Sequence, residues 1–315
     1  MSWTFERVHG PIGRPIAGLA SNGAAMLFSD PKDAQARIAS SGDNIWRFDP
    51  KDRKVSVARK YANRTYGIAF GPEGELFACQ EGGRRVVRMM PDGSANVTCT
   101  KLHGRVMNHP RFIAMDGKGR AWFSDRYHPL PAPHLEIHGE LDHQSVLRLT
   151  YQERPLPHGW HLERMTFDTN APTGVAVSAD GKTLYVSEND EAPKGVRELR
   201  AYPIRDDGTL DAPIVLHTFG ADKRGVHRGI EGICVDVAGN VFACAGSSKS
   251  GAGPLVYVFS PSGAVRATHA LPEGTPLNCA FGDVGLDTLY VSTVEGHLYR
   301  IRNTGYKGYV PFIGR

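Results

Sequence analysis

The sequence has no apolar run long enough to cross a membrane. A transmembrane helix needs about 20 consecutive apolar residues, and no stretch of the 315 residues approaches that length. The N-terminal residues MSWTFERVHGPIG also lack the apolar segment of a signal peptide. We therefore expect a cytoplasmic protein with no membrane partner.

Charge of one sign is not concentrated in any part of the sequence. The chain has 37 Lys and Arg against 33 Asp and Glu, a net charge of +4, and the basic residues are scattered. A surface that binds nucleic acid gathers its basic residues on one face, so we expect no nucleic-acid partner. The sequence does not indicate an oligomeric state.

Cysteine is scarce, and its spacing does not suggest a metal site. The five cysteines are odd in number and include no CxxC pair. Several lie within apolar strand patterns, which favours buried free thiols over disulfides or a zinc site. The sequence also has no GxSxG elbow, P-loop or dinucleotide fingerprint in the required strand–helix context.

Long amphipathic helical periodicity is absent, and a repeated strand pattern stands in its place. An apolar run, a turn rich in Gly, Asp or Asn, and a second strand recur about every 50 residues. Aromatic residues mark the second strand of each repeat. The repeats are GLASNGAAMLFSD (18–30), GIAFGPEGELFACQ (67–80), FIAMDGKGRAWFSD (112–125), GVAVSADGKTLYVSE (174–188), GICVDVAGNVFACA (232–245) and CAFGDVGLDTLYVST (279–293).

Six such units cannot bury their faces alone, but they can when arranged around one axis. We therefore predict an all-β fold, a six-bladed β-propeller, as a single domain over residues 1–315. The N-terminal strand, residues 2–9, is expected to close the last blade. The expected blades cover roughly residues 14–60, 61–105, 106–165, 166–222, 223–270 and 271–303.

The repeat also predicts where a site lies. The first strand of each propeller blade lines the central channel, and its start reaches one rim. Loops are longest at 126–143 and 189–229, and long loops often carry function. The residues expected at the six strand starts are Ala17, Tyr66, Arg111, Thr173, Glu231 and Asn278.

Three phrases give the sequence a family resemblance. PTGVAVSADGKTLYVSE, LDHQSVLRL and PLNCAFGDVGLDTLYVST resemble the SMP-30/gluconolactonase/luciferin-regenerating-enzyme family, and the resemblance extends over nearly the whole chain. Strictosidine-synthase-like and paraoxonase-like propellers are related. The resemblance implies a lactone hydrolase with one divalent cation, calcium or zinc, at the channel mouth, held by Glu, Asn and Asp oxygens.

The sequence departs from the ligand set that this resemblance implies. Ala17 stands in the place of the family's Glu, and Arg111 and Thr173 stand in the places of its two Asn residues. Only Glu231, in the place of the catalytic Asp, keeps a carboxylate. A guanidinium cannot be a metal ligand. We therefore expect no metal ligands at this position and no calcium or zinc there, and we favour no other cofactor.

The resemblance favours a hydrolase that acts on lactones of the sugar-lactone type or on related esters. Arg111 is expected to polarise the substrate carbonyl, and Glu231 is expected to act as general base. An arginine at the channel floor indicates a small-molecule substrate that is anionic or rich in carbonyl groups. The candidate substrate-binding residues are Tyr66, Glu81, His109, Asp125, Thr173, Glu188, His227 and Asn278.

Other interpretations stay open at this point. The same cup can serve a metal-independent isomerase, lyase or condensing enzyme, and a propeller can also bind a ligand or a protein without catalysis. Arg111 and Glu231 can simply neutralise each other across the channel. His109 and His227 have structural or surface roles as their alternatives.

Overall fold

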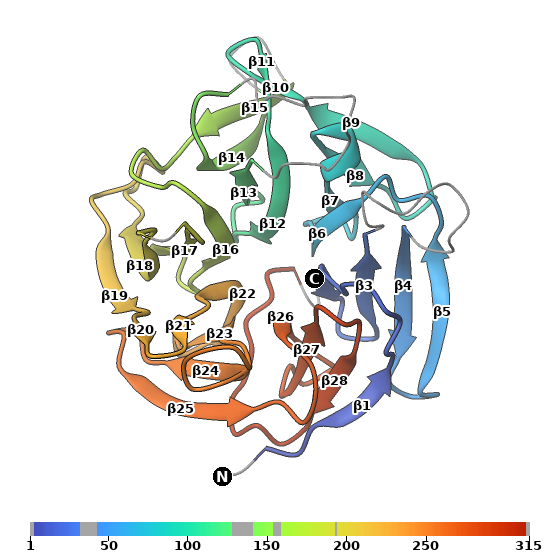
Figure 1. Ribbon diagram of the computed structural model, residues 1–315. Helices are drawn as coiled ribbons and strands as arrows, with labels where there is room; N and C mark the ends of the chain where they lie inside the picture. The colour runs from blue at the N-terminus through green and yellow to red at the C-terminus, as the bar shows by residue number, and fades with distance from the viewer. Residues whose placement is uncertain (1–2, 32–42, 128–140, 154–158, 193, 313–315) are drawn as a thin grey trace, which may run out of the picture.

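The computed structural model describes residues 3–31, 43–127, 141–153, 159–192 and 194–312. Six four-stranded antiparallel sheets surround a central axis (Figure 1). The described residues contain no α-helix and one short 3-10 turn, η1 (Glu81–Gly83). The expected all-β, six-bladed propeller is confirmed.

Each blade runs outward from the axis in chain order. The first blade is β2 (Leu19–Ser21), β3 (Met26–Asp30), β4 (Asn44–Asp49) and β5 (Lys54–Arg59); the second is β6 (Thr65–Phe70), β7 (Leu76–Gln80), β8 (Arg85–Met89) and β9 (Ala95–Cys99). The third is β12 (His109–Met115), β13 (Ala121–Arg126), β14 (Ser145–Gln152) and β15 (Gly159–Arg164). The fourth is β16 (Pro172–Val177), β17 (Thr183–Asn189), β18 (Arg197–Pro203) and β19 (Ile214–Thr218).

The last two blades complete the ring. The fifth is β22 (Ile230–Val235), β23 (Val241–Ala245), β24 (Leu255–Phe259) and β25 (Val265–Ala270); the sixth is β26 (Pro276–Gly282), β27 (Thr288–Thr293) and β28 (Leu298–Ile301) with β1 (Glu6–His9) as its outer strand. Two hairpins join blades: β10 (Lys101–Leu102) with β11 (Arg105–Val106), and β20 (Ala221–Asp222) with β21 (Gly225–Val226).

The two ends of the chain are joined in the sixth blade. Strand β1 pairs antiparallel with β28, so the N-terminal segment supplies the outer strand of the C-terminal sheet. Arg300 on β28 is buried and donates from Nη2 to Oε2 of Glu6 on β1 at 3.0 Å. Ring closure therefore rests on sheet hydrogen bonds reinforced by a partly buried ion pair.

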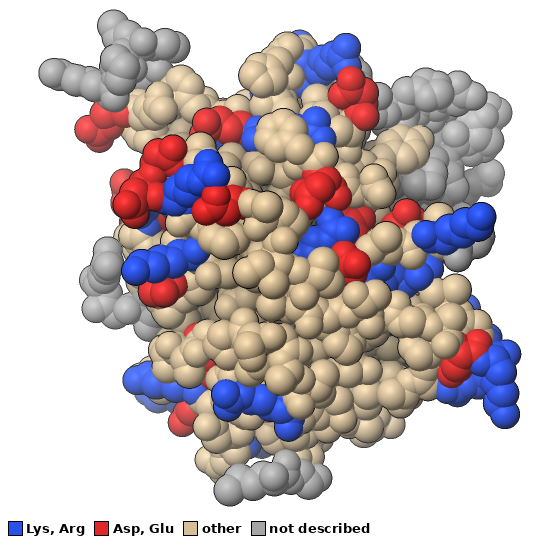
Figure 2. All heavy atoms as spheres, turned by 90° about the vertical axis from the view of Figure 1, so that its left-hand side faces the viewer, with Lys and Arg blue, Asp and Glu red and all other residues tan. Residues whose placement is uncertain are grey.

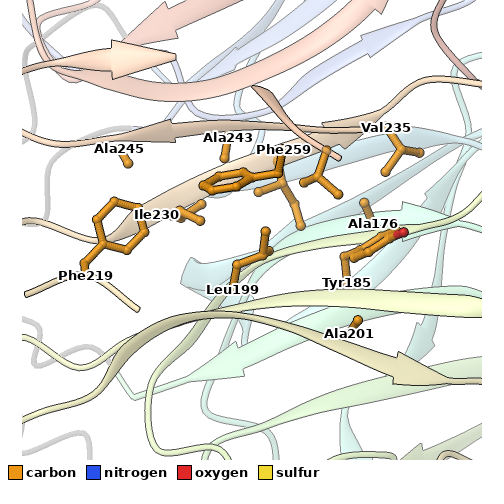
Figure 3. Packing of buried hydrophobic residues seen from close by; sticks show 12 residues of the cluster. Ala176, Tyr185, Leu199, Ala201, Phe219, Ile230, Val235, Ala243, Ala245 and Phe259 are labelled. Atoms are coloured by element: carbon orange, nitrogen blue, oxygen red, sulfur yellow. The ribbon is translucent and has the colours of Figure 1, made fainter. Parts of the chain in front are cut away.

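Aromatic side chains on the second strands fill the spaces between blades. The aromatic residues that mark the six repeats are all buried: Phe28, Phe77, Phe123, Tyr185, Phe242 and Tyr290. Figure 3 shows one such interface, where Tyr185 and Leu199 of the fourth blade face Ile230 and Phe259 of the fifth. Successive side chains of a strand point to opposite faces of the sheet, so each blade packs one face against each neighbouring blade.

The inner strands share a β-bulge near their starts. In four blades the register shifts so that two residues of the inner strand oppose one residue of the second strand. A bulge of this kind bends the strand and re-aims its side chains. The first residue of each bulge is a predicted channel-mouth residue: Tyr66, Arg111, Thr173 and Glu231.

Serine hydroxyls satisfy the extra backbone N–H that a bulge leaves unpaired. Ser124 accepts from the N–H of Phe112, and Ser187 accepts from the N–H of Gly174. Ser29 accepts from the N–H of Gly18 in the first blade and donates to the carbonyl of Tyr66 in the second, at 2.6 Å. These hydroxyls hold the bulges and also join neighbouring blades.

The C-terminal segment lies at one end of the central channel. A cavity of about 120 Å³ lies between the inner strands and is lined mainly by apolar residues, with Tyr309, Val310 and Pro311 at its far end. The segment is held by a bridge from Gly308 to Asp236. The predicted channel mouth is at the opposite end, where the inner strands start.

The outer surface carries mixed charge. Figure 2 shows Lys and Arg side chains interspersed with Asp and Glu over the face it presents, without a large area of one sign among the described residues. No described helix is long and apolar enough to cross a membrane.

Glycine at the second bulge position is required by the approach of the next blade. A Cβ on Gly67 would collide with the backbone carbonyl of Arg111. Gly67→Ala is expected to destabilise the protein by about 1–3 kcal/mol, because the two inner strands must move apart. Thermal unfolding measures this, with Gly220→Ala as control, since Gly220 has open space around it. Equal melting temperatures for the two variants would contradict the packing argument.

Candidate active site at the channel mouth

Arg111 is the centre of a largely buried cluster at the channel mouth. Its side chain is 13% exposed, and Nη2 donates to the Tyr66 hydroxyl at 2.6 Å. The guanidinium carbon lies 4.4 Å from the centre of the Tyr66 ring, a cation–π contact. Burial alone would lower the pKa of Arg111, but Tyr66, Glu231 and Glu81 outweigh burial and raise it. Arg111 is therefore a fixed positive charge.

Glu81 balances part of this charge from the neighbouring blade. Its Oε2 accepts from Nη2 of Arg64 at 3.1 Å, while its Oε1 lies 4.0 Å from Nε of Arg111 and has no hydrogen-bond partner in the part of the chain that the structure describes. Burial raises the pKa of Glu81 above its ordinary value, against the opposing charges of Arg111 and Arg64. Glu81 thus faces Arg111 without closing a hydrogen bond to it.

Glu231 approaches the cluster from the fifth blade. Its Oε1 accepts from Nδ2 of Asn189 at 3.0 Å and lies 3.7 Å from Nη2 of Arg228, while its buried Oε2 has no hydrogen-bond partner among the described residues. Burial would raise the pKa of Glu231, but the charges of Arg111, Arg228 and Arg126 lower it overall. The carboxylate is therefore ionised at neutral pH.

Arg111 and Glu231 interact through their charges but make no direct ion pair in the described structure. Each appears among the charges that shift the other's pKa, whereas the ion-pair contacts of Arg111 and Glu231 are with Glu81 and Arg228 respectively. The interpretation in which the two residues simply neutralise each other requires a closer approach. The arrangement leaves one carboxylate oxygen of Glu231 available to a ligand.

Two of the predicted mouth residues turn their side chains toward the neighbouring blades. The hydroxyl of Thr173 donates to the carbonyl of Ile230 at 2.8 Å and also contacts the hydroxyl of Ser187. Nδ2 of Asn278 donates to the carbonyl of Ala17 at 2.8 Å. Both side chains join neighbouring blades, and no hydrogen bond links them to the side chains of Arg111 or Glu231 in the described structure.

The other predicted residues lie around the cluster rather than in it. Asp125 and Glu188 are buried and accept from backbone N–H groups of Asn108 and Ala171 respectively. His109 is buried, with its ring 6.1 Å from that of Tyr127. His227 is partly exposed, and its Nε2 lies 3.6 Å from Asp222 of the β20–β21 hairpin.

Three residues of the cluster escaped the sequence analysis: Arg64, Asn189 and Arg228. Arg64 comes immediately before β6, Arg228 lies two residues before β22, and Asn189 ends the second strand of its blade. The repeat alignment shows a charged residue just before each of these two inner strands, and this signal could have found Arg64 and Arg228. Each of the two arginines meets a carboxylate of its own blade, Glu81 and Glu231 respectively.

The residues at the cation position that the resemblance implies do not fit a calcium or zinc ion. Ala17 has no side-chain oxygen, the Thr173 hydroxyl is used between blades, and Arg111 is held protonated. Among the described residues, no group of three or more His, Cys, Asp or Glu side chains is arranged to hold a metal ion. The mouth therefore offers oriented hydrogen-bond donors where a cation would need oxygen ligands.

This fold and mouth define a six-bladed propeller of the lactonase type, and the comparisons give its family. The model of the SMP-30/gluconolactonase/LRE-like region matches residues 38–295, so the chain belongs to that family. A gluconolactonase of Zymomonas mobilis is 26% identical over 298 residues, covering 89% of this chain and 76% of its own. The expected family is confirmed.

Two solved structures show the same fold. A gluconolactonase of Xanthomonas campestris is 25% identical, with a TM-score of 0.74, and the match covers 95% of this chain and 89% of the other. A calcium-binding regucalcin of Agrobacterium tumefaciens is 12% identical, with a TM-score of 0.71 over 100% of this chain and 99% of its own. The second likeness concerns the fold alone.

Asp125 provides a test of the electrostatics beside the mouth. Burial raises its pKa to about 7, against the hydrogen bond from Asn108 and the charge of Arg84. Between about pH 4 and pH 7 the folded protein keeps a proton that the unfolded chain has released, so the stability of the wild type falls as pH rises through this range. Asp125→Asn is expected to gain stability relative to wild type over the same range, by up to about 1.4 kcal/mol per pH unit.

Urea unfolding at several pH values between 4.5 and 7.5 measures this difference. Asp92→Asn is the control, because Asp92 is exposed and Ser94 lowers its pKa. The stability of this control should differ from wild type by a constant amount above pH 5. A pH-independent difference between Asp125→Asn and wild type would contradict the raised pKa.

Proposed function

We propose that the chain hydrolyses a lactone at the channel mouth without a bound metal ion. The observation that carries the proposal is the buried Oε2 of Glu231, which has no hydrogen-bond partner among the described residues and lies in the electrostatic field of Arg111 without a direct ion pair to it. The similarity to gluconolactonases of Zymomonas mobilis and Xanthomonas campestris supports lactone hydrolysis as the reaction class. The substrate is a small molecule that carries the lactone carbonyl.

In this mechanism Arg111 acts on the carbonyl oxygen. A lactone carbonyl becomes an oxyanion when water adds, and preorganised donors aimed at that oxygen stabilise it. Tyr66 accepts from Nη2 of Arg111, so its own hydroxyl proton is free to donate to the same oxygen. The cation–π contact with Tyr66 holds the guanidinium plane in place.

Glu231 acts as the base for water. Its Oε2 takes one proton from the attacking water as the new C–O bond forms and the carbonyl π-electrons move to the oxygen. When the tetrahedral intermediate collapses, the ring C–O bond breaks and the leaving alkoxide takes the proton from Glu231. The product is the open hydroxy acid, and Glu231 returns to its ionised form. Asn189 and Arg228 keep the carboxylate oriented through Oε1.

Arg111→Lys is expected to lower kcat roughly 10- to 1000-fold, the range for loss of one oxyanion donor. The charge is kept, but the planar fork that donates to two oxygens is lost. Glu231→Gln should lower kcat further, because it removes the base while preserving shape. Steady-state kinetics on a lactone panel measures both effects.

Arg88→Lys is the matched control for these variants. Arg88 pairs with Glu73 and Glu75 away from the mouth, so its kcat should match wild type. If Arg111→Lys and Glu231→Gln only lower the melting temperature and leave kcat unchanged, the two residues are structural and the mechanism is wrong.

Hydrolysis is also expected to persist after removal of divalent cations. The donor set at the mouth does not suit calcium or zinc, so dialysis against EDTA should leave kcat unchanged within the error of the assay. Elemental analysis of the purified protein provides a readout that does not depend on activity. One equivalent of calcium or zinc per chain, lost together with activity and localised beside Glu231, would refute metal-free catalysis.

A further inference from the structure

A polar cavity opens beside the mouth cluster, over the third and fourth blades. Its volume is about 720 Å³, and its walls include Asn108, Arg126, Tyr127, Arg164 and Asp190. Asp190 follows Asn189, the residue that holds Oε1 of Glu231, and Asn108 precedes His109 at the start of β12. The cavity therefore borders the elements that position the proposed base.

Arg126 links this cavity to the cluster. It is the last residue of β13, lines the cavity, and is one of the three cations that lower the pKa of Glu231. Its Nη1 is buried and has no hydrogen-bond partner among the described residues. A guanidinium nitrogen removed from water without a partner costs free energy, which a bound anion would recover.

Arg164, Asp142 and Asp190 also line the cavity, and each has at least one partner among the described residues. Arg164 donates from Nε to the carbonyl of Thr166 and lies over the Phe167 ring. Asp142 pairs with Arg105 at 3.6 Å, and Asp190 accepts from the N–H of Ala192. Arg126 is thus the cation of the cavity that has a buried N–H donor without a hydrogen-bond partner among the described residues.

We propose that Arg126 binds a carboxylate of the substrate, so that the substrate class is a lactone bearing a free carboxylate group. This inference rests on the proposed function: the lactone carbonyl meets Arg111 and Glu231 while the carboxylate lies in the adjoining cavity. A guanidinium binds a carboxylate through two parallel N–H···O bonds, which fixes the orientation of the ring. Such a contact selects against neutral lactones, because they would leave the buried donor unpaired.

Substrate binding at Arg126 would also change the proposed base. Arg111 on β12, Arg126 on β13, Arg228 before β22 and Asn189 on β17 all lower the pKa of Glu231, against burial. A substrate carboxylate on Arg126 offsets one of these cations. The pKa of Glu231 then moves up toward neutral pH, where a general base is more effective.

The first test is equilibrium binding, which does not depend on turnover. The probe is a γ-lactam carboxylate, a ring that resists hydrolysis, compared with its neutral carboxamide by titration calorimetry. Wild type is expected to bind the carboxylate roughly 10- to 100-fold more tightly, the range for a hydrogen bond between charged groups. Arg126→Gln should lose this preference, and Arg126→Lys should keep part of it.

Arg205→Gln is the matched control. Arg205 is exposed and pairs with Asp211 on the turn between β18 and β19, so this variant removes the same charge from the protein without touching the cavity. It should keep the full preference for the carboxylate. Melting temperatures check that all variants are folded.

The second test is hydrolysis of the matched lactone pair, a γ-lactone carboxylate and its carboxamide. Arg126→Gln is expected to raise KM for the carboxylate roughly 10- to 100-fold and so to remove the preference for the carboxylate over the carboxamide, whereas Arg111→Lys should lower kcat for both substrates and keep the preference. Equal binding of both lactams by wild type, or a preference retained in Arg126→Gln, would overturn the inference. Selective binding without hydrolysis of either lactone would keep the inference and refute the proposed function instead.

Discussion

The close approach of the inner strands around one axis is the constraint on which the rest of the molecule depends. Gly18, Gly67, Gly174 and Gly232 each stand where a Cβ would collide with the next blade, and bulges in the inner strands re-aim the side chains that precede three of these glycines. The third and sixth blades differ, because Phe112 and Cys279 take the place of glycine. The ring of Phe112 meets Tyr66 edge-on, with ring centres 5.3 Å apart. One of the two exceptions therefore falls beside the residue that holds Arg111.

The electrostatics of the mouth follow from this crowding. Strands packed this closely bury the side chains that they direct inward, and a buried charge is tolerated only when others compensate it. Arg111, Glu81 and Arg64 form one chain of opposite charges, and Glu231 with Arg228 forms another. The two chains approach each other without joining. Oε1 of Glu81 and Nε of Arg111 in the first chain, and Oε2 of Glu231 in the second, are buried and have no hydrogen-bond partner among the described residues.

The sequence predicts the ring better than it predicts the site. Turns rich in glycine and aspartate between alternating strands repeat six times, and because each repeat can bury its faces only against its neighbours, the propeller follows from local patterns. The same alignment locates Arg111 and Glu231 at strand starts. It cannot show that Thr173 and Asn278 turn toward neighbouring blades, since a bulge decides the direction of each side chain. The alignment also cannot pair Glu231 with Asn189, because the two residues lie on different blades and are 42 positions apart in the chain.

Replacing a cation by an arginine would change what the rest of the site must provide. A metal ion attracts an oxygen from many directions, whereas a guanidinium donates in one plane, and in this structure that plane is fixed by the Tyr66 ring. The substrate carbonyl must then arrive within that plane, and the orientation has to come from contacts elsewhere on the substrate. A second anchored group is the simplest source of such orientation. The proposed reaction therefore needs both Arg111 and an anion-binding cavity beside it. The guanidinium can stabilise the oxyanion only when contacts at the other end of the substrate hold the carbonyl oxygen in the guanidinium plane.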